Sequence, residues 1–211
     1  MMSMTRGTRI SPLHLDVGGV KISGAVDLQI DKLDGTWEIN DYKVTSVYSV
    51  LSEKPEWEQQ LNCYAYLARK VHNRNVTSLK IIALLKDWSR RAALSKADYP
   101  PSRVAVVDIP VWSFEKQEAY VEERVTIHKN AKLAVDGGDS PPYCSDQERW
   151  VRGETWALMK EGRKAAVKLY DNKEQAHEAA SIAGTGHSVE YRPGSPVRCE
   201  GNYCLVRDWC K

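Results

Sequence analysis

The stretch Thr36-Trp37-Glu38-Ile39-Asn40-Asp41-Tyr42-Lys43-Val44 decides the fold of this chain. Its alternating pattern predicts a β-strand over about 36–44. Asp41 and Lys43 are two residues apart, so their side chains lie on the same face of that strand. An acidic and a basic group are therefore held together at a fixed place on a sheet.

The segment before this stretch predicts strand structure over about 13–31. From Val20 to Asp31 the residues alternate, with Val20, Ile22 and Ile30 on one face and Asp27 on the other. We expect Asp27 to lie on the polar face of the predicted strand.

The connection Leu33-Asp34-Gly35 sets the register of the two strands. We interpret it as a three-residue hairpin loop with Gly35 in the left-handed position, so that Lys32 pairs with Thr36. This register places Asp27 opposite Asp41, with Lys43 diagonal to it. A two-residue Asp34-Gly35 turn would instead place Asp27 opposite Tyr42. We predict the first register because only it assembles a site.

A helix is predicted over about 55–72, with Pro55 near its first position. Apolar residues recur at helical spacing, at Trp57, Leu61, Tyr64, Ala68 and Val71. Gln60 and Tyr64 are four residues apart and project from the same side of this helix, at the edge of its apolar stripe.

The order Gly24-x-x-Asp27, Asp41-x-Lys43, Gln60-x-x-x-Tyr64 resembles the RecB-like branch of the PD-(D/E)XK nuclease superfamily. The resemblance implies that Asp27 and Asp41 bind Mg²⁺ or Mn²⁺, with the Tyr42 carbonyl as a further ligand. Lys43 would orient the attacking water or stabilise the transition state. Gln60 and Tyr64 would line the site and position the DNA or the water.

Each of these residues also has a plain structural interpretation. Asp27 and Asp41 would then be solvated strand residues, and Lys43 a charge that discourages edge pairing. Gln60 would be a surface residue beside a core Tyr64. Taken jointly, the three motifs favour the nuclease interpretation over these single-residue ones.

Composition limits the classes of protein. Charged residues make up 27% of the 211 residues, and no apolar run approaches the length of a membrane span. The first residues lack the apolar region of a secretory signal, so we expect a cytoplasmic protein. The resemblance to RecB-like nucleases implies a bacterial or phage-infected cell. The net charge is only +2, so a basic surface for nucleic acid must be local. The residues between 149 and 168 offer either such a DNA track or a mixed, solvated surface.

The remainder of the chain predicts two parts, a nuclease core at 1–135 and an α+β module at 136–211. Residues 1–12 are expected to be frayed. Strands are expected near 78–87 and 103–109, and a helix over about 113–134. After the linker 136–142 we expect a hairpin around 161–162, a helix over 172–183 and a strand near 187–192.

Four of the five cysteines follow the linker, at Cys144, Cys199, Cys204 and Cys210. Three within twelve residues favour metal ligation over disulfides in a chain without a secretory signal. Some RecB-like nucleases, among them AddB and the CRISPR adaptation nucleases, carry a four-cysteine [4Fe–4S] staple. The resemblance therefore implies such a cluster, with zinc as the alternative. In those relatives the first cysteine precedes the nuclease core, whereas Cys144 follows it.

These observations predict an α/β restriction-endonuclease-like core, a mixed sheet flanked by helices, with an appended small α+β module. The expected activity is Mg²⁺- or Mn²⁺-dependent exonuclease cleavage of single-stranded or duplex DNA ends, in recombination, repair or phage DNA processing. RecB-like nucleases commonly have a helix before the first core strand, and none is evident here. A non-catalytic DNA-binding or scaffold domain of the same fold, and a zinc-stapled interaction module with an accidental D-x-K, remain the alternatives. A protein partner or an oligomer is left open.

Overall fold

A computed structural model describes residues 6–8, 12–52 and 54–210. The chain divides into two compact units, residues 1–130 and 131–211, and each is described by itself. The predicted boundary lay five residues later. Helix α4 (Phe114–Asp136) begins in the first unit and ends in the second.

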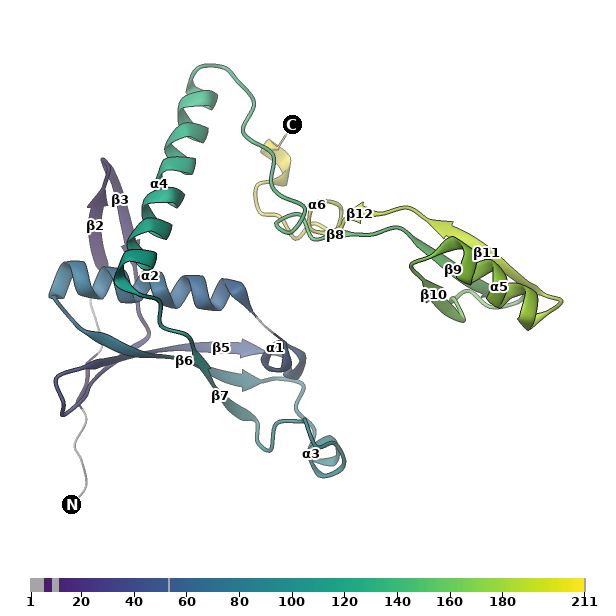
Figure 1. Ribbon diagram of the computed structural model, residues 1–211, viewed down its shortest axis with the longest axis horizontal. Coiled ribbons are helices and arrows are strands. Elements are labelled where there is room, and N and C mark those ends of the chain that lie inside the picture. The colour runs from purple at the N-terminus through teal and green to yellow at the C-terminus, as the bar shows by residue number, and fades with distance from the viewer. Residues whose placement is uncertain (1–5, 9–11, 53, 211) are drawn as a thin grey trace. The chain divides into compact units, whose positions relative to one another are not determined.

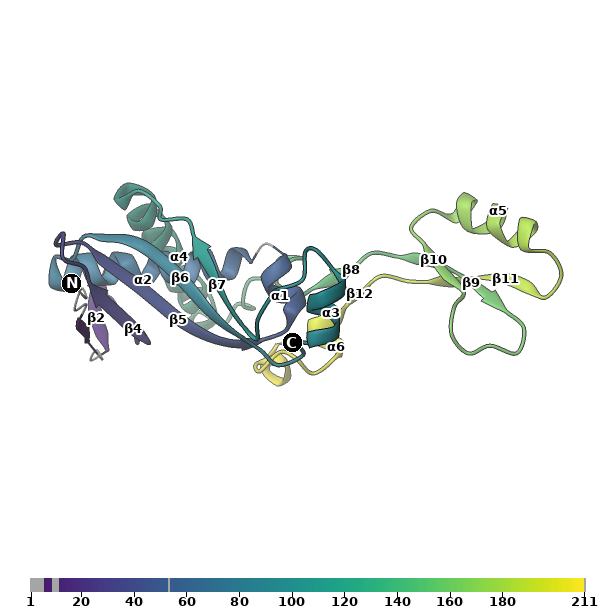
Figure 2. The same ribbon diagram turned by 90° about the horizontal axis from the view of Figure 1, so that it is seen from below.

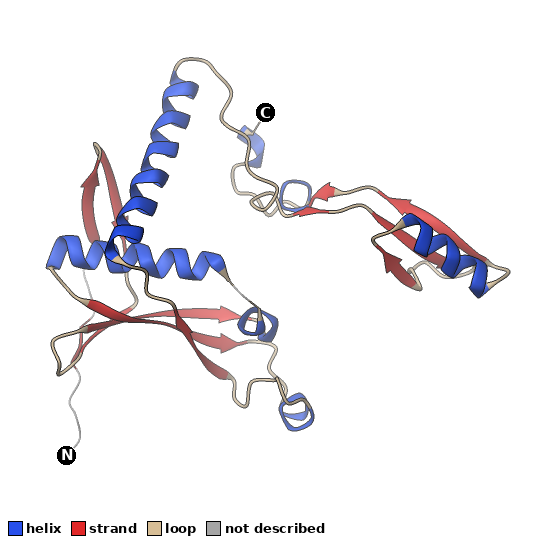
Figure 3. Cartoon of the chain, viewed as in Figure 1, coloured by secondary structure: helices blue, strands red, loops and turns tan. Residues whose placement is uncertain are grey.

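A five-stranded mixed sheet forms the centre of the first unit (Figures 1 and 3), in the order β1-β4-β5-β6-β7. Its strands are β1 (Arg6–Thr8), β4 (Leu28–Asp31), β5 (Trp37–Thr45), β6 (Val76–Leu85) and β7 (Val104–Ile109). β5 and β6 are parallel, and every other neighbouring pair is antiparallel. The mixed sheet and its helices confirm the predicted fold class.

The helix α2 (Pro55–His72) connects the two parallel strands and covers one face of the sheet (Figure 1). Pro55 begins it and Asn73 ends it in the left-handed conformation, with φ 54°. Trp57, Leu61 and Ala68 are buried against sheet residues that include Ile39 and Ile81. The predicted helix is confirmed, and its apolar stripe forms the main core.

The single strand predicted over Val20–Asp31 is wrong. The chain forms a separate hairpin of β2 (Leu13–Val17) and β3 (Val20–Gly24), then leaves it to join the main sheet as β4. Gly18 and Gly19 make the turn with positive φ, at 57° and 80°. A Gly-Gly pair between two apolar runs is itself a hairpin signal. Residues 25–27 therefore lie between two sheets.

The frayed start predicted for residues 1–12 is also wrong in part, because β1 pairs with β4. The remaining residues of that prediction, except Pro12, lie outside the described ones. Two short helices were not predicted, α1 (Val47–Leu51) and α3 (Arg90–Ser95). Helix α4 packs through Val121 and Val125 on Tyr66 of α2 and on the β2–β3 hairpin.

The second unit contains a three-stranded antiparallel sheet, β10-β9-β11. It comprises β9 (Thr155–Lys160), β10 (Lys168–Tyr170) and β11 (His187–Arg192), with helix α5 (Lys173–Ala183) packed on it through the buried Ala176. The predicted helix and strand are confirmed. A second pair, β8 (Val151–Arg152) with β12 (Ser195–Pro196), precedes α6 (Val197–Glu200) and the 3-10 turn Arg207–Trp209.

Candidate functional site

The hairpin between β4 and β5 has the register predicted from the sequence. Leu28 pairs with Asn40 and Asp31 with Trp37. Lys32 N donates to Thr36 O at 2.9 Å, and Gly35 has φ +78°. One step beyond Leu28, this register sets Asp27 opposite Asp41.

Asp27 precedes the ladder rather than forming part of it. Its carboxylate Oδ2 accepts a hydrogen bond from the Tyr42 backbone N at 2.9 Å. Asp27 lies between β3 and β4. Its side chain therefore accepts from the Tyr42 N–H, in place of a backbone carbonyl of a paired strand. The exposed Asp27 carboxylate is thereby fixed beside the backbone of Asp41 and Tyr42.

Asp41 and Lys43 lie on the face of β5 that α2 covers. Asp41 is only 3% exposed, and its Oδ2 lies 2.8 Å from Lys43 Nζ. The two groups form an ion pair, but the angles between them do not meet hydrogen-bond geometry. Among the described residues, the buried Oδ2 therefore has no hydrogen-bond donor. A buried carboxylate oxygen without a donor is costly unless something else binds it.

The helix residues continue this chain of contacts. Lys43 Nζ donates to Gln60 Oε1 at 2.9 Å, and Gln60 Nε2 donates to the Tyr64 hydroxyl at 3.0 Å. The side chains of Asp41, Lys43, Gln60 and Tyr64 therefore contact one another in series, with Asp27 beside them. The structure brings all five residues of the predicted catalytic set to one place.

Gly24 has a role in this site that the sequence did not assign. A Cβ at this position would lie 2.9 Å from Cε1 of Tyr64 and 3.0 Å from Cδ1 of Leu67. Only glycine lets the tyrosine ring approach the end of β3 this closely. The motif spacing had marked Gly24, but only the packing shows that it supports Tyr64.

Tyr42 contributes through its backbone, because its side chain is exposed on the other face of β5. That face has a second buried carboxylate, Glu38, which is 8% exposed. Glu38 accepts hydrogen bonds from Ser78 Oγ at 2.9 Å and from Asn40 Nδ2 at 3.2 Å, and pairs with Lys80 at 3.0 Å. Burial alone would raise the pKa of Glu38, but these partners outweigh it and hold the pKa below its ordinary value.

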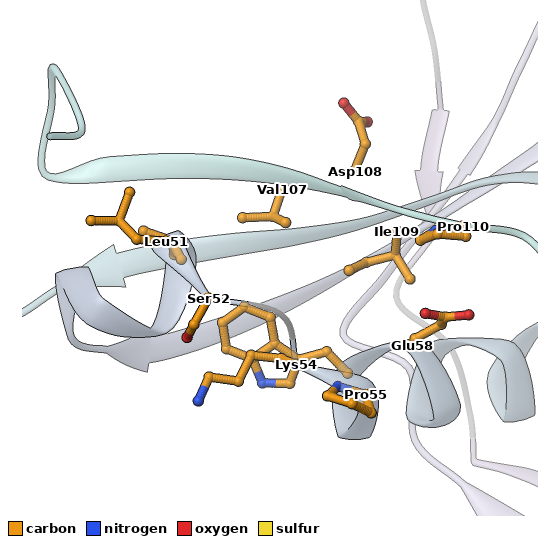
Figure 4. A pocket seen from close by; sticks show the side chains of 11 residues that line it. Leu51, Ser52, Lys54, Pro55, Glu58, Val107, Asp108, Ile109 and Pro110 are labelled. Atoms are coloured by element: carbon orange, nitrogen blue, oxygen red, sulfur yellow. The ribbon is translucent and has the colours of Figure 1, made fainter. Parts of the chain in front are cut away.

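A pocket of about 460 Å³ lies elsewhere, between α1, the start of α2 and β7 (Figure 4). None of the five site residues is among those that line it: Val50, Leu51, Ser52, Lys54, Pro55, Trp57, Glu58, Val107, Asp108, Ile109 and Pro110. The catalytic candidates are thus outside this pocket.

Across the described residues, no group of three or more His, Cys, Asp or Glu side chains is arranged to hold a metal. Asp27 and Asp41 therefore provide two carboxylates, without a third such side chain beside them in the described part of the chain. Mg²⁺ is commonly bound by one or two carboxylates together with waters and substrate phosphates. The pair, with the donor-less Asp41 Oδ2, fits a divalent ion.

The predicted four-cysteine staple is not supported by this geometry. Cys144, Cys199, Cys204 and Cys210 are free thiols that form no metal-binding group in the described part of the chain. The segment before Cys199 nevertheless returns to the segment after Cys144, since Arg198 N donates to Arg149 O at 3.1 Å.

Aromatic and arginine side chains, and not the thiols, stabilise the contact between these two segments. The Trp150 ring lies 5.6 Å from that of Tyr203, and the Arg198 guanidinium lies 5.4 Å from the Trp150 ring. Close spacing in the sequence therefore does not by itself bring these thiols into a metal-binding group within the described part of the chain.

Comparison with known families decides the classification. A model of the PD-(D/E)XK nuclease superfamily matches residues 3–211. The chain belongs to the PD-(D/E)XK nuclease superfamily. No curated protein and no solved structure matches it. Membership identifies the mixed sheet and its flanking helices as a restriction-endonuclease-like fold. Among the described residues, no helix has the length and hydropathy needed to span a membrane.

Proposed function

We propose that this member of the superfamily is a Mg²⁺- or Mn²⁺-dependent deoxyribonuclease that acts as an exonuclease on DNA ends. The observation that carries the proposal is the buried Asp41 Oδ2, which lacks a hydrogen-bond donor and lies 2.8 Å from Lys43. Glu38, the other buried carboxylate of β5, by contrast accepts a hydrogen bond at each of its two oxygens.

Asp27 and Asp41 would hold the divalent ion, with the Tyr42 carbonyl as a further ligand. When bound, such an ion polarises a phosphoryl group and lowers the pKa of a bound water. The hydrogen bond from Tyr42 N fixes Asp27, and burial fixes Asp41. The two carboxylates therefore need little reorganisation to bind a cation.

Lys43 would act on the charge that develops at the phosphate. Its ammonium carries three donors, and one of them is directed to Gln60 Oε1. Gln60 in turn is oriented by Tyr64. Gln60 and Tyr64 thus hold the lysine near the scissile bond and also present polar groups to the substrate.

The test uses linear single-stranded and duplex DNA labelled at either end, together with a closed circle of the same sequence. Cleavage should require Mg²⁺ or Mn²⁺, release short products from the ends, and spare the circle. Asp41→Asn should remove the activity, and Glu38→Gln, which changes a buried carboxylate of the same strand, should retain it.

Cleavage of the circle would exclude the exonuclease assignment. DNA binding without cleavage under Mn²⁺ would instead support a non-catalytic DNA-binding domain. Recombination, repair and phage DNA processing are the processes we propose for an activity on ends. Iron–sulfur or zinc ligation by the four cysteines stays a prediction of the sequence and forms no part of this mechanism.

A further inference from the structure

We propose that the connection between β6 and β7, residues 86–103, is a phosphate-binding surface that holds the DNA strand beside the cleavage site. This inference rests on the proposed function and specifies how the substrate is held. The segment contains five basic residues and two aspartates, in a chain whose net charge is only +2. The five basic residues, all exposed, are Lys86, Arg90, Arg91, Lys96 and Arg103.

Carboxylates of the described residues do not neutralise the positive charges of this segment. Among the described residues, none of its five basic side chains forms an ion pair with a carboxylate, whereas Lys32, Lys43, Lys70 and Lys80 of the same unit do. One of the two aspartates, Asp87, accepts a hydrogen bond from Val47 N at 2.7 Å. A concentration of unpaired positive charge attracts a polyanion.

The segment is also fixed to the sheet, so its charges are held in place. Trp88 Nε1 donates to Pro100 O at 2.8 Å, and Ser89 N donates to the Tyr99 hydroxyl at 2.9 Å. These two contacts tie the start of the connection to its end. Helix α3, which carries Arg90 and Arg91, projects between them.

The position of the segment matches the site. β5 and β6 are parallel, with Lys43 beside Ala83 and Thr45 beside Leu85. Lys86 N donates to Thr45 O at 2.9 Å, so the basic segment begins about 7 Å along the strand from Lys43, at two residues' rise. Figures 1 and 2 show α3 at the end of the sheet where β5 and β6 terminate.

Phosphates along one DNA strand are spaced by about 3.4 Å of helix rise. A strand that occupies the site at Lys43 would reach Lys86 within a few nucleotides and then α3. The contacts are with phosphates, so we expect them to add affinity without sequence preference.

The experiment measures binding without chemistry. Full-length protein in the Asp41→Asn background, in EDTA, is titrated with a labelled single strand of about 20 nucleotides, longer than one footprint, at several salt concentrations. The pair Arg90→Gln with Arg91→Gln should weaken binding. It should also make the slope of log affinity against log salt shallower by about 1.4, the value for two phosphate contacts. Arg90→Lys with Arg91→Lys should keep most of the slope.

The matched control is Lys129→Gln with Lys132→Gln, which removes the same charge from two exposed lysines of α4 that belong to neither candidate DNA surface. It should leave the slope unchanged. An equal change in both pairs would show an effect of net charge, and no change in the first pair would leave α3 without a role. Either result overturns the proposal.

Cleavage by the otherwise wild-type protein separates this proposal from the proposed function. Loss of affinity in the Arg90/Arg91 pair, in a protein that never cleaves DNA, would sustain the surface and refute the nuclease. Cleavage with unaltered binding in that pair would sustain the nuclease and refute the surface.

Discussion

The two faces of β5 carry two buried carboxylates that differ in one respect. Glu38 faces away from α2 and is met by Ser78, Asn40 and Lys80. Asp41 faces α2, has a single cation beside it, and keeps a buried oxygen without a donor among the described residues. Burial is nearly equal, at 8% and 3% exposure. The two carboxylates differ in their hydrogen bonds, and we propose that Glu38 stabilises the fold whereas Asp41 binds a ligand.

The largest expected effect is on catalysis. Asp41→Asn should lower cleavage by at least about 100-fold, because it removes a proposed ligand of the divalent ion that stabilises transition-state charge. It should change the free energy of unfolding little, because Asn fills the same space and the part-exposed Lys43 keeps its hydrogen bond to Gln60. Glu38→Gln should retain cleavage and lower the free energy of unfolding. Rates under Mn²⁺ and urea titrations of both variants check this. Equal cleavage rates in the two variants would show that Asp41 and Glu38 do not differ in function.

The second effect concerns Lys43. Lys43→Ala should lower the rate about as much as Asp41→Asn, because both act on the same reacting phosphate. The double variant should be scarcely slower than either single one, since residues that act as a unit are not additive. Single-turnover rates of the three proteins measure this. Fully multiplicative losses would show that the two side chains act independently.

The third effect is on metal binding. At about 100 times its Kd, Mn²⁺ should raise the free energy of unfolding by about 2.7 kcal/mol. The increase should be absent in Asp41→Asn and retained in Glu38→Gln. Thermal unfolding with and without Mn²⁺, after treatment with EDTA, tests this without an activity assay. A Mn²⁺ response that survives Asp41→Asn would place the ion elsewhere.

The fourth effect is smaller and concerns Gly24. Gly24→Ala should cost about 1–3 kcal/mol of stability, typical of overpacking, because the new methyl would lie 2.9 Å from the Tyr64 ring. It should also slow cleavage by displacing Tyr64 from Gln60. Adding Tyr64→Ala should recover part of the stability but none of the rate. Urea titration and rate measurements follow both, and an unperturbed Gly24→Ala would show that the ring moves freely.

The smallest effect is a pH dependence. The pKa of Glu38 is held below its ordinary value in the folded protein. Its ionised form therefore contributes stability that is complete above the usual pKa of about 4.3 and is lost as the pH falls through the folded value. The difference in unfolding free energy between wild type and Glu38→Gln should narrow over that acid range. A constant difference would show that Glu38 does not titrate with folding.

Much of the site was predictable because its spacings are local. The period of a strand put Asp41 and Lys43 on one face, and the period of a helix put Gln60 beside Tyr64. Gly35 fixed the hairpin register, since its φ of +78° suits the three-residue loop. The break after Gly24 was missed because alternation alone continues through it, and the Gly18-Gly19 turn that signals the hairpin was not used.

The sequence by itself determined the order of the motifs, the helix α2, the register of β4 with β5 and the superfamily, because short-range periodicity and turn geometry are encoded residue by residue. Only the tertiary structure decided which groups contact one another. It joined Lys43 to Gln60, closed Gly24 on Tyr64, satisfied Glu38 but not Asp41, and left the cysteines without a common ligand geometry. These outcomes depend on how distant segments pack in three dimensions, and spacing along the chain does not specify the directions in which their side chains meet.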